Sequence, residues 1–170
     1  MMEFSPNLTP KEIIRLGSFG GTYFDTCGGK IDINYKEFPI DWFENLPDNF
    51  YKSKVYNKNI NFFKVKCGQT QEEWEEKGWI KKQDQRGWFQ WYCRYFLGRR
   101  SDDDERQIRR WNNFCGDKGR FRNNIYKKIF DRNTDIDDTS FSLALRQSLL
   151  HWGYRLNKGD YEMWKVKNGF

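Results

Sequence analysis

A cluster of arginines in the middle of this chain could bind the phosphates of a nucleic acid. Guanidinium groups donate paired hydrogen bonds to phosphate oxygens, and several on adjoining helix surfaces could follow a backbone. Two lysines further along the chain add charge on the next predicted helix. We expect nucleic-acid binding, with DNA favoured over RNA. The predicted contact residues are Arg99, Arg100, Arg106, Arg109, Arg110, Lys127 and Lys128.

The distribution of charge supports this prediction. The formal net charge is +6. Residues 81–132 hold 15 Lys or Arg against 7 Asp or Glu, whereas the rest of the chain holds 15 against 17. A local positive field of this kind favours polyanionic partners. An acidic protein would be attracted by the same charges, so a protein-interaction module is an alternative. A solvated basic face is a further interpretation, with Arg106 paired to Asp102 or Asp103 at helical spacing.

A second alternative is an enzyme that acts on nucleotides or on nucleic-acid bases. Cys93 could be a nucleophile with His151 as its base, and Asp25 could act as a general base beside Gly20-Gly21. The sequence contains no recognised catalytic spacing that joins these groups. Because Cys93 lies in the most aromatic stretch and His151 precedes Trp152, packing inside a core is the favoured explanation of both residues.

The sequence predicts neither a metal site nor a cofactor. The four cysteines, at positions 27, 67, 93 and 115, form no Cys-x-x-Cys pair, which is typical of reduced thiols in an intracellular protein. The acidic run 102–105 lacks the glycine and alternating spacing of a calcium loop. It follows Ser101, which we expect to cap a helix whose first turn favours carboxylates. No uncharged stretch approaches the length of a membrane span, and the first residues do not resemble a signal peptide. We expect a cytoplasmic or nuclear protein.

Capping motifs and apolar spacing predict the helices that would position these residues. Thr9-Pro10-Lys11-Glu12 and Thr70-Gln71-Glu72-Glu73 are capping boxes. The rings between Trp88 and Phe96 recur at three- and four-residue intervals, the period of one helical face. Further helices are predicted after Ser101, from about Arg120, and from Phe141 to about Trp152. Residues 60–65 could be extended.

Aromatic residues must supply most of the core. They make up 19% of the chain, and each can bury a large area. The rings of residues 88–96 could stack nucleobases, but rings at helical spacing more often form a core. We predict a mainly α, compact multi-helix single domain spanning residues 1–170, with a possible small extended element in its N-terminal half. Residues 1–80 are expected to be less regular, residues 87–156 helical, and residues 157–170 only weakly patterned.

Several blocks of the sequence resemble a known family. The blocks are Gly87-Trp88-Phe89-Gln90-Trp91-Tyr92-Cys93-Arg94-Tyr95, Gly98-Arg99-Arg100, Asp103-Asp104-Glu105-Arg106-Gln107-Ile108 and Arg110-Trp111. Together they are similar to the central signature of an uncharacterised family of small aromatic-rich proteins from bacteria, fungi, algae and large DNA viruses. Phe19-Gly20-Gly21 and Arg146-Gln147 with Leu149-Leu150-His151-Trp152 resemble its flanking blocks. The resemblance covers most of the chain and implies no particular activity.

Overall fold

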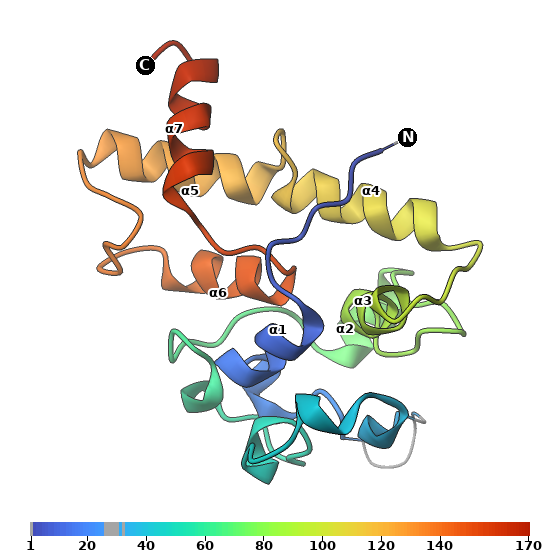
Figure 1. Ribbon diagram of the computed structural model, residues 1–170. Helices are drawn as coiled ribbons and strands as arrows, with labels where there is room; N and C mark the ends of the chain where they lie inside the picture. Colours follow the sequence, from blue (N-terminus) through green and yellow to red (C-terminus); the bar gives the residue numbers. More distant parts are fainter. Residues whose placement is uncertain (1, 26–30, 32) are drawn as a thin grey trace.

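The computed structural model describes residues 2–25, 31 and 33–170, and it is mainly α-helical, as predicted (Figure 1). Short 3-10 turns, among them residues 19–21 and 58–60, connect the first helices, and the described residues contain no strand. The α-helices are α1 (Pro10–Leu16), α2 (Gln71–Glu76), α3 (Trp88–Phe96), α4 (Asp104–Cys115), α5 (Arg120–Asp131), α6 (Leu143–His151) and α7 (Lys158–Lys167).

Local sequence signals account for where several helices begin. Both predicted capping boxes form, because the side chain of Thr9 accepts from the Glu12 amide and that of Thr70 accepts from the Glu73 amide. Helix α4 begins at Asp104, later than a cap at Ser101 would place it. The Ser101 hydroxyl instead accepts from the amide of Asp103 and contacts the Asp104 carboxylate, so it orders the turn before the helix.

The ring-rich face of α3 forms the centre of the core. Phe4 inserts its ring edge-on against five rings, all within 6.4 Å between centroids. Four of these rings come from α3 and the fifth is Trp111 of α4. Such edge-to-face arrangements suit the charge distribution of aromatic rings. The N-terminal segment therefore joins α3 to α4, while α5 packs against α4, α6 and α7.

Two regions differ from the sequence predictions. Residues 60–65 form bends and turns instead of an extended element, and their contacts are described below. The weakly patterned tail forms helix α7, because the Asn157 side chain accepts from the Asp160 amide and Tyr161 and Trp164 are buried. Across the described part of the chain, no helix is long and apolar enough to cross a lipid bilayer.

Candidate nucleic-acid interface

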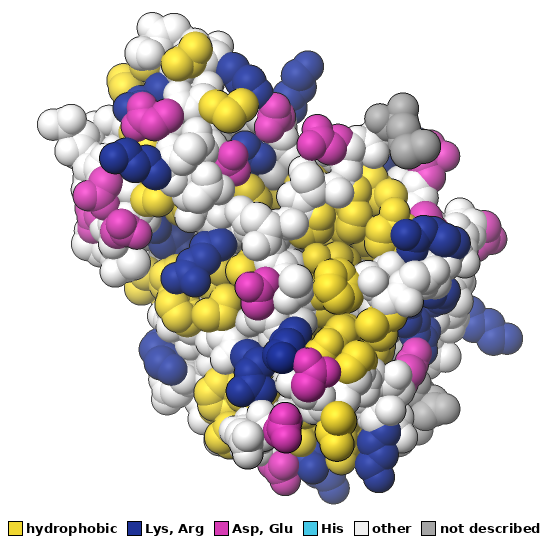
Figure 2. Space-filling model, in the orientation of Figure 1, with side chains coloured by type: hydrophobic (Ala, Val, Ile, Leu, Met, Phe, Trp, Pro, Cys, Tyr) yellow, Lys and Arg dark blue, Asp and Glu magenta, His cyan; other side chains and the backbone are white. Residues whose placement is uncertain are grey.

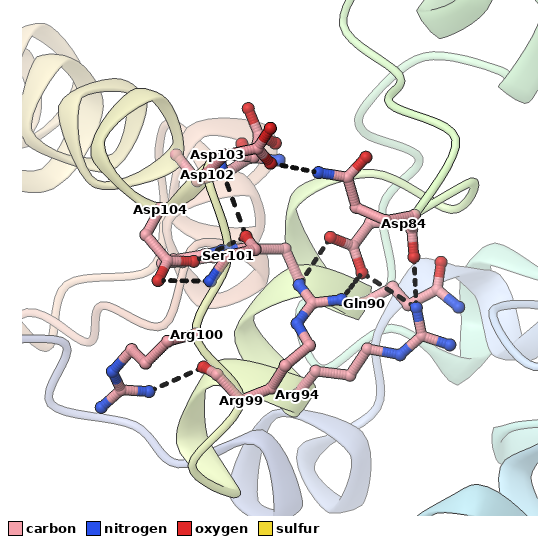
Figure 3. A network of polar contacts seen from close by, with 12 residues as sticks. Asp84, Gln90, Arg94, Arg99, Arg100, Ser101, Asp102, Asp103 and Asp104 are labelled. Carbon is pink, nitrogen blue, oxygen red and sulfur yellow. Dashed lines mark hydrogen bonds and ion pairs between the residues drawn. The ribbon is translucent and has the colours of Figure 1, made fainter.

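Arg99 is held by a buried carboxylate and does not reach freely into solvent. Its two terminal nitrogens donate to Asp84 over 2.8 and 2.6 Å, and the Asp84 side chain is 0% exposed (Figure 3). Arg94 binds the same carboxylate at 3.0 Å and also pairs with Glu37. Asp84 thus joins the loop before α3 to the α3–α4 connection. Arg99 serves the fold, contrary to its predicted place on a phosphate-binding surface.

Two of the α4 arginines are also paired with acidic residues three or four positions earlier in the chain. Arg106 donates to both oxygens of Asp103 over 2.5 and 2.8 Å, one of the pairings considered from the sequence. Asp103 is buried, so this pair is part of the packing. Arg109 donates to Glu105 over 2.7 Å, but both side chains are exposed. Exposed pairs contribute about 0–1 kcal/mol, so only Arg109 of these two could exchange its partner at low cost.

Arg110 and Arg100 are each placed against aromatic rings. The Arg110 guanidinium lies 5.6 Å from the ring centroid of Trp79 and 5.4 Å from that of Trp152, and it donates to Gln107. Burial, with the nearby charge of Arg106, lowers the pKa of Arg110 to about 10. Arg100 lies 3.8 Å above the Tyr95 ring and donates to two backbone carbonyls. Arg100 is exposed, whereas Arg110 is mostly enclosed.

The predicted cations therefore do not form one surface of free positive charge. Lys127 pairs with Asp131, and Lys128 donates to the Ser142 hydroxyl. The face shown in Figure 2 has basic side chains interspersed with acidic ones and separated by exposed apolar atoms. Of the seven residues, Arg100, Arg109, Lys127 and Lys128 remain exposed. A binding function based on all seven is inconsistent with this geometry.

The predicted nucleophile and base are not hydrogen-bonded to each other. Among the described residues, His151 bonds with Phe19, Gln147 and Cys67, and none of its hydrogen bonds reaches Cys93. Cys93 is fully buried, and burial raises its pKa well above the usual thiol value. Two hollows in the surface, of about 620 and 500 Å³, lie beside Asn112 and Arg94, and none of the three candidates lines them. The predicted Cys93–His151 pair does not form.

His151 has a hydrogen-bond pattern that prevents it from acting as a base toward Cys67. The Gln147 carbonyl oxygen accepts from the Phe63 amide, so its NH2 group faces Nε2 of His151 at 3.0 Å. The Phe19 amide donates to the same Nε2 over 3.2 Å. The proton of the neutral ring therefore resides on Nδ1, which lies 3.6 Å from Sγ of Cys67. Nδ1 already carries a proton and cannot take one from the thiol.

The described cysteines form no disulfide and no metal site. Cys67, Cys93 and Cys115 are free thiols, and Cys27 lies outside the described residues. Burial raises the pKa of Cys67 to about 11. Within the described residues, no three Cys, His, Asp or Glu side chains gather in a way that could hold a metal ion.

A different segment, which we call the lysine loop (residues 49–66), presents positive charge without acidic neighbours in its sequence. No Asp or Glu occurs between Asp48 and Glu72, and the loop carries five lysines. Four of them are exposed and form no ion pair with any described residue: Lys54, Lys58, Lys64 and Lys66. Lys52 alone is paired, with Asp48. Figure 1 shows the loop, coloured teal to green, beside α1 and well away from α4 and α5.

Three glycines allow the lysine loop to lie directly on the backbone of residues 17–21. A Cβ atom at Gly17 would lie 2.0 Å from the carbonyl oxygen of Ile60, and one at Gly21 would lie 1.9 Å from that of Asn49. A Cβ at Gly20 would overlap the ring of Tyr56 at 2.2 Å. Backbone hydrogen bonds join the loop to all three glycines. Only glycine permits so close an approach at these positions, where φ is also positive.

Asn61 fixes the loop from inside. Its side chain is 0% exposed, accepts from the Gly20 amide over 2.8 Å, and donates to the Tyr56 hydroxyl and the Val65 carbonyl. All of these contacts connect backbone and side chains within the loop and its glycine support. The lysine loop is consequently an ordered structure with its polar interior satisfied. The exposed ammonium group of Lys64 donates to the Asn59 carbonyl of the same loop over 2.7 Å, and Lys54, Lys58 and Lys66 are exposed on its surface.

A comparison of net charge over long segments does not reveal this surface. The five lysines belong to the large part of the chain outside residues 81–132, whose net charge is negative. A search for segments that lack Asp and Glu would have found them. The glycines at 17, 20 and 21 were a second signal, since each marks a place where another backbone can approach closely.

Comparisons with known proteins found no match. No protein-family model, no curated protein and no solved structure is significantly similar to this chain.

Proposed function

We propose that this protein binds nucleic acid and that the lysine loop makes the main contacts. The observation that carries the proposal is the set of four exposed lysines that form no ion pair with any described residue, on an ordered loop without acidic residues. Phosphate contacts from lysine supply most of the sequence-independent affinity of nucleic-acid-binding proteins. Arg100, Arg109, Lys127 and Lys128 lie on another part of the molecule and would contribute at most a secondary contact.

Removing the lysine charges tests the proposal. We expect the variant Lys54→Gln/Lys58→Gln/Lys64→Gln/Lys66→Gln to lose at least about tenfold in affinity for a labelled oligonucleotide at low salt. The dependence of log affinity on log salt should become shallower by about one for each lysine that contacts a phosphate. Fluorescence anisotropy across a series of salt concentrations measures both quantities.

The matched control removes four exposed charges elsewhere. In Arg100→Gln/Arg109→Gln/Lys127→Gln/Lys128→Gln, the same number of cations is lost from the α3–α5 side. We expect this variant to bind nearly as well as the wild type. Equal losses in both variants would indicate only a general effect of net charge, and no binding by the wild type at low salt would contradict the function itself.

An acidic protein partner would use the same lysines, and nuclease treatment of a complex captured from cells separates the two cases. A nucleic-acid-bridged complex should dissociate after treatment. We also propose an intracellular location, which the free thiols of Cys67, Cys93 and Cys115 support. Membership of the uncharacterised aromatic-rich family stays a prediction based on the resemblance of the sequence blocks.

A further inference from the structure

We infer that the lysine loop selects single-stranded over double-stranded nucleic acid, by stacking unpaired bases on Tyr56 and Phe62. The inference rests on the proposed function, because it names the form of nucleic acid that the same loop would take. Proteins that bind single strands combine a positively charged track with aromatic rings, since every base offers a face for stacking. Duplex DNA keeps its bases stacked inside, so it offers phosphates and groove edges but no free base face on which a ring could stack.

Two aromatic rings of the loop are exposed among its lysines. Tyr56 is 38% and Phe62 40% exposed, which leaves part of each ring in solvent. The lysines Lys54 and Lys58 flank Tyr56 in sequence, and Lys64 follows Phe62. Arg155 adds a further cation, with its guanidinium 5.5 Å from the centroid of the Phe62 ring. Bases stacked on these rings would have their phosphates within reach of several cations.

The two rings are held in place before any ligand binds. Tyr56 lies on Gly20, and its hydroxyl accepts from Asn61 over 3.0 Å. Phe62 packs edge-on against Phe63 at 4.9 Å between centroids. Side chains that are already ordered lose little conformational entropy on binding, which favours affinity. The two rings are therefore preorganised for stacking.

The segments that carry the two rings are anchored to the same short stretch of backbone. The Asn57 amide, next to Tyr56, donates to the Gly20 carbonyl, and the Phe62 amide donates to the Gly17 carbonyl. Gly17 and Gly20 are three residues apart, so the Cα atoms of these two anchor residues can be separated by at most about 11 Å. Single-strand-binding surfaces cover about 4–16 nucleotides, so one strand is long enough to contact both segments.

A comparison of two ligands tests the inference. A fluorescein-labelled strand of about 15 thymidines, which forms no secondary structure, is titrated with the full chain, and a labelled duplex of the same length is titrated in parallel. We expect the single strand to bind more tightly. Phe62→Leu should weaken single-strand binding about fivefold or more and leave duplex binding within about twofold.

Phe96→Leu is the matched control, because Phe96 is an equally exposed ring on α3, outside the loop. Circular dichroism and thermal melting confirm that both variants fold. Equal affinity for the single strand and the duplex, or equal effects of Phe62→Leu and Phe96→Leu, would overturn the stacking inference and leave nucleic-acid binding intact. Absence of binding to both ligands at low salt would instead refute the proposed function.

Discussion

Replacement of Asp84 by asparagine is expected to destabilise the fold by about 3–5 kcal/mol, the usual cost of removing one partner from a buried ion pair. Asp84 is fully buried and receives hydrogen bonds from both Arg94 and Arg99. The neutral amide cannot balance their charges, and its NH2 group would face guanidinium donors. Urea unfolding at neutral pH, followed by tryptophan fluorescence, measures the free energy of unfolding.

Asp102→Asn is a suitable control for the Asp84 experiment. Asp102 lies nearby on the surface and accepts from the Gln83 side chain over 3.2 Å (Figure 3). We expect this variant to stay within about 0.5 kcal/mol of the wild type, as is usual for surface substitutions. If Asp84→Asn were equally mild, Arg99 would not be held as described and would return to the candidate binding residues.

Acidification from pH 7 to pH 5 is expected to cost about 2 kcal/mol of stability through His151, at about 1.4 kcal/mol for each pH unit below its unfolded-state pKa. Burial lowers the pKa of His151 in the folded protein to about 3, from an ordinary value of 6.5. Between these values the unfolded chain binds a proton that the folded protein does not. The contribution of neutral His151 to the free energy of unfolding is therefore fully present above pH 6.5 and is lost as the pH falls toward 3.

His151 is the only histidine in the chain, so the histidine signal in the measurement comes from this residue alone. Urea unfolding at the two pH values gives the change in free energy, and NMR follows the ring protons of the single histidine. In His151→Gln, which has no titrating ring, stability should change little over this interval. A ring that titrates near pH 6.5 in the folded protein would contradict the described hydrogen bonds from Phe19 and Gln147.

The two results would show that Asp84 and His151 stabilise the fold. Asp84 joins Arg94 and Arg99, and His151 joins α6 to the segments that contain Phe19 and Cys67. An aspartate beside arginines and a histidine beside a cysteine are residue types that, in a sequence, suggest ligand binding or catalysis. In the folded protein their hydrogen-bonding groups face one another, so these residues can stabilise the fold without touching a ligand.

Local signals made much of the helical architecture predictable. The capping boxes at Thr9 and Thr70 and the ring spacing of α3 act between residues a few positions apart, so the sequence displays them directly. The start of α4 was placed too early, because Ser101 bonds within the preceding turn. The extended segment predicted at residues 60–65 was wrong because its backbone bonds to Gly17 and to the Gln147 side chain, which no local pattern indicates.

The candidate site was less predictable for a similar reason. Whether an arginine is free depends on its partner, and the carboxylate that binds Arg99 lies 15 residues earlier in the chain. Two partners of His151, Cys67 and Phe19, are 84 and 132 residues away in the chain. The lysine loop was recognisable only in part, since its charge is local but its order depends on distant glycines. The sequence shows where the cations and thiols lie along the chain, but it does not show the distant groups that neutralise or enclose them in the fold.

NMR chemical-shift mapping shows whether the lysine loop is the surface that contacts nucleic acid, as proposed. Isotope-labelled protein is titrated with an unlabelled oligothymidine strand. We predict that the largest amide shifts fall in residues 49–66 and around Arg155. Shifts concentrated on α4 and α5, or no shifts at low salt, would contradict the claim.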